Sequence, residues 1–275
     1  MSRGRDVPTR AILYILLLLF SMFFLLPMYV MLTTGFKSFD EVSLKTMWNF
    51  PSGLYTENFK AAFEQLVPHL WNSLRLVIPT AFISAFIGSI NGYILTKWRF
   101  PGTAVIFPLI LFGMFIPYQA ILIPMVQFMN WSNLYGDIPG LALVHIIYGI
   151  PITTLIFRGY YAGVPTEMVE AARIDGANLI QTYTHIFLPI SIPAFVVVLI
   201  WQFTSSWNDF LFAVALTNPG NWPIMVALNN MAGSQIIAWN VQMAASFLAA
   251  VPTLIVYIIL GRYFLRGLMS GALKG

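Results

Sequence analysis

The stretch Glu170-Ala171-Ala172-Arg173-Ile174-Asp175-Gly176 is a short polar segment between two long apolar runs. Pro165 suits the first turn of a helix, where its missing N–H is not needed. Gly176 can take the left-handed conformation that ends a helix. The pattern predicts a helix of about three turns over Pro165–Asp175, too polar and too short to cross a bilayer.

The composition indicates that lipid surrounds most of the chain. Of 275 residues, 59% are hydrophobic and 9% are charged, whereas a soluble domain has about 25% charged residues. The net charge is +4, but the basic residues lie at the ends of apolar runs, so no nucleic-acid partner is expected. The chain has no cysteine, which excludes disulfides, thiolate metal sites and cysteine nucleophiles.

Six stretches are apolar and long enough to cross about 30 Å of hydrocarbon, which takes about 20 helical residues. They are Ala11–Thr34, Asn72–Leu95, Ala104–Phe128, Ile138–Phe157, Ile190–Leu216 and Met243–Leu265. The expected fold class is therefore all-α, a polytopic membrane protein with six transmembrane helices. Gly140, Gly149 and Pro151 interrupt the fourth stretch. Pro117 and Pro124 predict a kink in the third.

The distribution of cations predicts the orientation. The first apolar run is too long for a signal peptide and no small-residue cleavage site follows it, so we expect an uncleaved helix. With the N-terminus inside, ten cations are cytoplasmic and four are outside, which together account for all 14. The cytoplasmic ones are Arg3, Arg5, Arg10, Lys97, Arg99, Arg158, Arg173, Arg262, Arg266 and Lys274. This bias predicts a multi-pass protein of the cell (inner) membrane with both termini in the cytoplasm.

Small residues in the second apolar stretch predict a close helix contact. Ser84, Gly88 and Gly92 recur at four-residue spacing. In lipid, small residues at this spacing let two helices approach closely. Asn91 lies beside this row, and lining a solute pathway is its alternative role.

The polar segment has two faces if it is a helix. The charged face is formed by Glu167, Glu170 and Arg173, and a second face by Met168, Ala171, Ala172 and Asp175. Alanines let a foreign surface approach the helix backbone, and the charges can fix its orientation. The residues alone leave two alternatives open, a docking helix for a cytoplasmic partner and a solvated connecting helix.

The spacing of Glu170-Ala171-Ala172, Gly176, Ile186 and Leu188-Pro189 resembles the signature of ABC-importer permeases. The resemblance extends over nearly the whole chain and implies the type-1 importer permease fold. In that family this helix docks on an ATP-hydrolysing subunit. The resemblance therefore implies ATPase-coupling roles for Glu167, Glu170, Ala171, Ala172, Arg173, Asp175 and Gly176. The sequence lacks the phosphate-binding pattern G-x-x-x-x-G-K-[ST]. We therefore expect no enzyme activity and no cofactor in this chain, with ATP and Mg bound by a separate ATPase.

Two further matches resemble the second permease of maltose-type sugar importers. The fifth stretch contains Trp207-Asn208-Asp209-Phe210, and the chain ends in a glycine-rich tail from Arg266 to Gly275. In that group the tail reaches the ATPase dimer, which implies contacts by Gly267, Gly271 and Lys274. The glycines are expected to keep the tail pliable.

The resemblance implies the transmembrane permease subunit of an ATP-driven, binding-protein-dependent sugar importer. The implied partners are a second permease, two ATP-binding subunits, a periplasmic or extracellular sugar-binding protein and the sugar itself. The chain then divides into residues 1–69 (N-terminus, first helix and outer loop), 70–265 (permease core) and 266–275 (cytoplasmic tail). One alternative is a permease for amino acids, peptides or polyamines. Another is a secondary transporter or channel, which often has paired intramembrane charges and repeated halves.

Candidates for a sugar path are polar and aromatic residues within the apolar stretches, because sugars bind through hydrogen bonds and aromatic stacking. They are Asn91, Tyr118, Gln119, Trp201, Gln202, Asn208 and Asp209. Asp209 is the only acid in the six stretches, and pairing with another helix is its alternative role. A straight helix from Leu188 would place it about 30 Å further along, near the outer interface. His69, His145 and His185 lack metal-ligand spacing, so no metal site is expected.

The outer connection Asn218–Asn240 contains several polar residues. They are Asn229, Asn230, Gly233, Ser234 and Gln235. The family resemblance implies that this segment reaches toward the docked binding protein. A solvated connector is the alternative.

Overall fold

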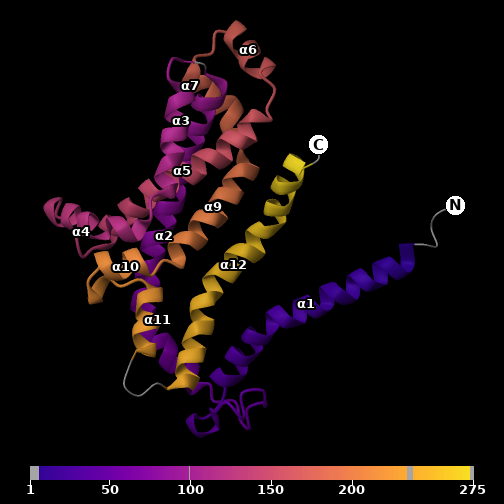
Figure 1. Ribbon diagram of the computed structural model, residues 1–275, viewed down its shortest axis with the longest axis vertical. Coiled ribbons are helices and arrows are strands. Elements are labelled where there is room, and N and C mark those ends of the chain that lie inside the picture. Colours follow the sequence, from indigo (N-terminus) through magenta and orange to yellow (C-terminus); the bar gives the residue numbers. More distant parts are fainter. Residues whose placement is uncertain (1–5, 99, 234–237, 273–275) are drawn as a thin grey trace. The chain divides into compact units, whose positions relative to one another are not determined.

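The computed structural model describes residues 6–98, 100–233 and 238–272, and these are mostly helical (Figure 1). The helices are α1 (Asp6–Gly35), α2 (Glu57–Lys97), α3 (Thr103–Phe112), α4 (Leu122–Trp131), α5 (Ile138–Ala162), α6 (Glu167–Ile174), α7 (Leu179–Thr182), α8 (Leu188–Ile190), α9 (Ile192–Trp207), α10 (Leu211–Leu216), α11 (Ile224–Ala232) and α12 (Trp239–Ala272). The short turns are η1 (Phe39–Glu41), η2 (Gly113–Phe115), η3 (Tyr118–Ile121) and η5 (Pro219–Asn221), and η4 (Tyr183–Phe187) is π-helical. The all-α prediction is confirmed for the part of the chain described.

Among these residues, four helices are long and apolar enough to cross a membrane. They are Thr9–Gly35, Glu57–Lys97, Ile138–Ala162 and Trp239–Gly261. Two bent pairs also qualify, Thr103–Phe115 with Tyr118–Trp131 at 87° and Leu179–Ile190 with Ile192–Trp207 at 75°. Counting each bent pair as one span gives up to six, which agrees with the six expected transmembrane helices.

The bend in the third span confirms the kink predicted there. Ile116 is extended, with ψ 119°, and Pro117 has ψ 118°. Proline disfavours the helical conformation of the residue before it and has no N–H to continue the hydrogen-bond ladder. Pro124 is accommodated in the first turn of α4, where that N–H is not required.

The fourth span is a single helix, so the expectation that Gly140, Gly149 and Pro151 interrupt it is wrong. The two glycines are sites of close approach instead. A Cβ at Gly140 would collide with the Leu134 carbonyl, and one at Gly149 would lie 2.7 Å from the Gln202 amide. Glycine thus lets neighbouring groups pack against the α5 backbone.

The fifth span is divided where a continuous helix was expected. α8 and α9 meet at Ser191, and residues 208–210 separate α9 from α10. The Asp209 carboxylate accepts hydrogen bonds from the N–H groups of Phe212 (3.4 Å) and Ala213 (3.0 Å). Such side-chain acceptors replace main-chain carbonyls and favour a new helix start. The assumption of a straight helix from Leu188 is therefore wrong, and the position of Asp209 near the outer interface stays a prediction.

The connections contain more helix than the sequence suggested. α2 begins at Glu57, inside the expected outer loop, and α11 occupies part of the expected connector Asn218–Asn240. α12 continues through Gly267 and Gly271 to Ala272, so the expected pliable tail is helical over these residues. Ser234, Gln235 and Lys274 lie outside the described residues.

Internal contacts divide the chain into two units. One comprises Met1–Val67 with Leu228–Val251, and the other Pro68–Ala227 with Pro252–Gly275. In the first unit the buried Lys37 ammonium donates to the Thr46 carbonyl at 2.8 Å. Burial lowers the pKa of Lys37, and the nearby Glu41 carboxylate opposes this shift. The buried lysine therefore connects the end of α1 to the backbone of the following loop.

The predicted close helix contact lies between α2 and α5 in the second unit. A Cβ at Gly92 would lie 2.7 Å from Phe157 Cβ and 2.8 Å from the Arg158 nitrogen. Thr153 Oγ1 donates to the Ser84 carbonyl at 3.1 Å in the same contact. The small-residue contact is thus confirmed.

Gly92→Val is expected to lower the thermal unfolding temperature of the purified protein in detergent, because its methyl groups would force α2 away from the α5 backbone. Overpacking of this kind costs about 1–3 kcal/mol. Gly159→Ala is the matched control, since a Cβ there meets nothing within 4 Å. Equal unfolding temperatures for the wild type and Gly92→Val would contradict the contact.

Candidate functional site

The first candidate site is α6, which stands at one end of the second unit, after α5 and before α7 (Figure 1). It lies within the predicted segment Pro165–Asp175 but is shorter, with eight residues. Gly176 has a φ of 80°, and its N–H donates to the Arg173 carbonyl at 3.1 Å. The predicted left-handed helix end at Gly176 is confirmed.

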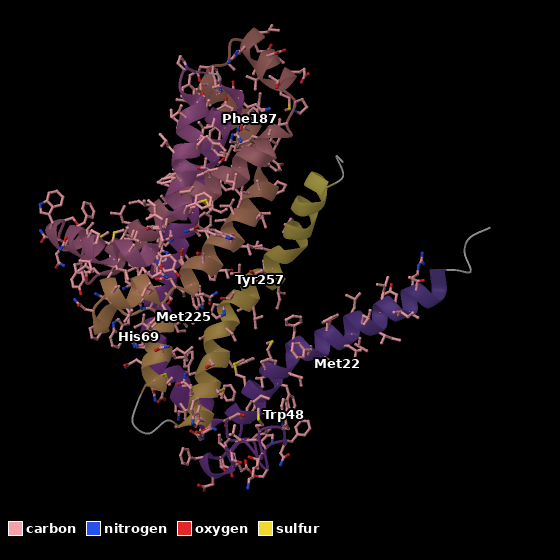
Figure 2. All side chains as sticks on the ribbon, in the orientation of Figure 1. Met22, Trp48, His69, Phe187, Met225 and Tyr257 are labelled. Carbon is pink, nitrogen blue, oxygen red and sulfur yellow. The ribbon has the colours of Figure 1, made fainter. Side chains whose placement is uncertain are left out.

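One face of α6 packs into the core of the second unit. Val169 and Ala172 are 2% and 5% exposed. Val169 belongs to a buried cluster with residues of α2, α5, η4 and α9, including Phe157 and Phe187. Figure 2 shows Phe187 at the end of the unit that carries α6. Ala171 and Ala172 were expected to share an accessible face, and this expectation is wrong for Ala172. Residues three positions apart lie on the same face of a helix, so Ala172 is buried together with Val169.

The outward face of α6 is polar and carries two exposed large apolar side chains, Met168 and Ile174. Its exposed residues include Glu167, Glu170, Ala171, Arg173 and Asp175, and Ile174 is 87% exposed. The Arg173 guanidinium also lies 4.3 Å from the centre of the Trp98 ring, a cation–π distance. Lys97 donates to the Val164 carbonyl just before α6. α6 is therefore fixed to the end of α2 while it presents charges and Ile174 outward.

The second candidate site is a cavity of about 470 Å³ at the break between α9 and α10. Its lining includes five of the seven predicted pathway residues, namely Tyr118, Trp201, Gln202, Asn208 and Asp209. The remaining two do not line it. Asn91 lies in the contact of α2 with α5, where its amide donates to Thr154 Oγ1 at 3.4 Å, and Gln119 is an exposed residue of η3.

Asp209 pairs with His145, a residue of α5 that the sequence reading did not select. His145 Nε2 lies 3.2 Å from Asp209 Oδ2, and the two side chains are 8% and 13% exposed. The structure therefore shows Asp209 bonded to another span while it also lines the cavity. The one indication in the sequence that His145 matters is its position inside an apolar stretch, where ionisable residues are commonly functional.

The described residues contain no group of three side chains able to hold a metal ion.

Gln202 is a buried polar residue beside the cavity, and its side-chain amide is only partly hydrogen-bonded. It is 2% exposed, and its Nε2 donates to the His145 carbonyl at 3.1 Å. Its Oε1 has no hydrogen-bond partner within the described part of the chain. Gly149 permits this close approach of the amide to α5. This oxygen is itself buried against α5, so it lies behind the cavity wall.

The predicted binding-protein segment maps partly to α11. Asn229, Asn230 and Gly233 are exposed at the end of this helix and just after it. They lie in the first unit, apart in sequence from the cavity residues. Their role as a contact surface stays a prediction.

The described part of the chain has the fold of an α-helical, multi-pass membrane protein. Residues 84–269 match the family described as "Binding-protein-dependent transport system inner membrane component". This match covers more than half of the chain, and the chain belongs to this family. Its members are permease components of ABC transporters, as the names of its relatives state.

Similar proteins cover almost the full length of the chain. A "Probable ABC transporter permease protein" of Pyrococcus horikoshii is 44% identical over 98% of this chain and 99% of its own. A xylose/arabinose import permease protein of Haloferax volcanii is 35% identical over 98% of this chain and 96% of its own. A chain of a bacterial ABC transporter involved in alginate import has a TM-score of 0.79 at 20% identity, covering 95% and 98%. Because the alginate transporter chain is only 20% identical, its similarity shows a shared fold and nothing further.

Proposed function

We propose that this chain is the transmembrane permease subunit of an ATP-driven, binding-protein-dependent sugar importer. The observation that carries the proposal is α6, an exposed helix whose inner face is anchored in the core. A force on its outer face would reach α2, α5 and α9 through the cluster that contains Val169. The chain has no nucleotide-binding loop of its own, so the force would come from another subunit.

The proposed partner at α6 is an ATPase that binds ATP and Mg. The charges of Glu167, Glu170 and Arg173 would orient the docked helix, and Ile174 would enter an apolar depression of the partner. ATP-driven closure of the ATPases would then move α6 and switch the bundle between inward-facing and outward-facing states. Gly267, Gly271 and Lys274 would contact the ATPases from the C-terminal tail.

The proposed assembly also contains a second permease and an external sugar-binding protein, with both termini of this chain in the cytoplasm. The excess of lysine and arginine on one side supports this orientation. Asn229, Asn230 and Gly233, with Ser234 and Gln235 of the same connection, would face the binding protein.

A sugar cargo is supported by the relatives and by the cavity. The name of the Haloferax relative states import of xylose and arabinose. The cavity of this chain combines aromatic rings with amide and carboxylate groups. These are the groups that hold an uncharged, hydroxyl-rich solute in a small-ligand site.

The proposal is tested by reconstituting the complete complex in liposomes and measuring uptake of radiolabelled sugars. We expect uptake that requires ATP, the ATPase subunits and the sugar-loaded binding protein together. Uptake by this chain without the ATPase would show a secondary transporter instead. ATP-dependent uptake of amino acids but of no sugar would overturn the cargo assignment.

A further inference from the structure

We propose that a groove between α2 and the start of α5 binds a phospholipid with an amine-bearing head group, whose phosphate contacts Arg75 and whose acyl chain lies against Ile83 and Ile146. The groove has a volume of about 650 Å³ and lies within the second unit. It is separate from the cavity at the α9–α10 break, because the two linings share no residue. The proposal requires only that the chain spans a membrane, so it does not depend on the sugar cargo.

The groove has a polar end and an apolar end. Ile83 follows Arg75 by eight residues (83 − 75), which is about 12 Å along a helix. On the other wall, Ile146 follows Asp137, the residue before α5, by nine residues (146 − 137). The contacts between α2 and α5 advance in the same direction along both helices, so the two charged residues lie at one end. A phospholipid is divided in the same way, with a charged head group and apolar chains.

The first argument is the unpaired charge of Arg75. This exposed residue lies three positions (75 − 72) inside the expected span Asn72–Leu95. Its guanidinium is 5.1 Å from the centre of the Trp71 ring, but within the described part of the chain it forms no hydrogen bond or ion pair. An arginine near the end of a span extends toward the lipid head groups. There a phosphate can accept two parallel hydrogen bonds from its planar donors.

The second argument is that the neighbouring amides are already occupied. The side-chain nitrogens of Asn72 and Asn221 donate to main-chain carbonyls, and Asn221 Nδ2 also donates to Asp137 Oδ1 at 2.7 Å. No ion pair joins Arg75 to Asp137 among the described residues. The groove therefore presents one cation and one anion that do not neutralise each other. A head group that carries a phosphate and an ammonium would supply a counter-charge to both.

The third argument concerns the kind of occupant. The groove is open to its surroundings, since Arg75 and Pro79 are exposed and Ile83 is 44% exposed. A transmembrane helix of another subunit would need both an acidic and a basic side chain at this level, and such residues are rare within spans. Lipid head groups carry phosphates at every position around the protein, and basic pockets between transmembrane helices bind them. Charge complementarity thus favours a lipid over a protein helix.

The test is native mass spectrometry of the complete transporter, delipidated in detergent and supplied with one probe at a time. The probes are phosphatidylethanolamine, phosphatidylglycerol, diacylglycerol, which lacks the phosphate, and inorganic phosphate. We expect saturable retention of phosphatidylethanolamine, weaker retention of phosphatidylglycerol and none of the other two. Arg75→Gln should weaken the retention of phosphatidylethanolamine about tenfold, because a charge-assisted contact is lost, and Arg75→Lys should restore part of it.

Lys60→Gln is the matched control, because Lys60 is an exposed cation of α2 that does not line the groove; retention should be unchanged. If Arg75→Gln fails to assemble, Ile83→Trp decides, since the larger side chain would fill the apolar end and should displace the lipid. Ile78→Trp is its control, because Ile78 is exposed on α2 outside the groove.

Several results would overturn the site. Diacylglycerol held as well as phosphatidylethanolamine, or wild-type retention in both Arg75→Gln and Ile83→Trp, would show that lipid contacts here are not specific. Equal retention of the two phospholipids would remove Asp137 from head-group recognition. Displacement of the lipid by inorganic phosphate would show a site for a free anion instead.

The competing occupant and the proposed function are tested separately. The chain has no cysteine, so Ile83→Cys places a single thiol of this subunit in the groove. A high yield of bifunctional maleimide links from this thiol to the second permease would show that a protein helix fills the groove, and would overturn the lipid site. A complex that retains the lipid but transports no sugar would overturn the proposed function and leave the lipid site standing.

Discussion

Gly176→Pro is expected to abolish ATP-driven uptake while the protein still inserts in the membrane. Gly176 has a φ of 80° and its N–H donates to the Arg173 carbonyl. Proline fixes φ near −65° and has no N–H, so α6 would lose its C-terminal end and its outer face would be displaced. We expect ATP hydrolysis that no longer responds to the loaded binding protein, measured together with sugar uptake in proteoliposomes.

Gly176→Asn is the matched control for this variant. Asparagine tolerates the left-handed conformation better than most residues, and a Cβ at position 176 meets nothing within 4 Å. It should retain most of the coupling. Glu170→Lys reverses a charge on the exposed face and should weaken ATPase binding without changing the fold of α6. Full coupling in both Gly176→Pro and Glu170→Lys would contradict docking at α6.

Asp209→Ala is expected to give the second large effect, a strong loss of sugar uptake with the complex still assembled. The substitution removes the acceptor for His145 Nε2 and for the N–H groups of Phe212 and Ala213. Each buried donor left without a partner costs about 1–3 kcal/mol. The break between α9 and α10 would then lose the groups that hold it, and the cavity wall would change shape.

Asp209→Asn separates this structural role from the charge. Its amide retains an oxygen that can accept from the main chain, so uptake should lie between those of the wild type and Asp209→Ala. Uptake rates would be normalised to the amount of assembled complex. An unchanged rate in Asp209→Ala would remove Asp209 from the transport mechanism.

The sequence predicted those features of the fold that local chemistry determines. Apolar stretches of sufficient length identified the spans, because a bilayer admits few alternatives to a helix. The kink at Pro117 and the helix end at Gly176 follow from the backbone restrictions of these two residues. The place of α6 followed from a polar segment between apolar runs.

Features that depend on distant partners were not predictable in this way. Gly149 was expected to interrupt a helix, but it is a contact for Gln202, which lies 53 positions later in the chain (202 − 149). Ala172 was expected to face outward, but Val169 and Ala172 complete a core supplied by other helices. Helical periodicity shows which residues share a face but not which face is buried.

The cavity also combines residues that local chemistry identifies with contacts that depend on distant parts of the chain. Residue chemistry selected Trp201, Gln202 and Asp209, because polar and aromatic groups are conspicuous within apolar stretches. His145 was set aside, since nothing local shows that it meets Asp209 across 64 positions. The break between α9 and α10 also depends on where the Asp209 carboxylate points, which the sequence does not contain.

The most direct test of the central claim uses a single thiol on the outer face of α6. The chain has no cysteine, so Ala171→Cys introduces the only thiol of this subunit at an exposed position. We predict that a membrane-impermeant maleimide labels it in inverted vesicles but not in intact cells, and that a short bifunctional reagent links it to the ATPase subunit. Labelling from outside the cell, or no link to the ATPase in an actively transporting complex, would contradict the account.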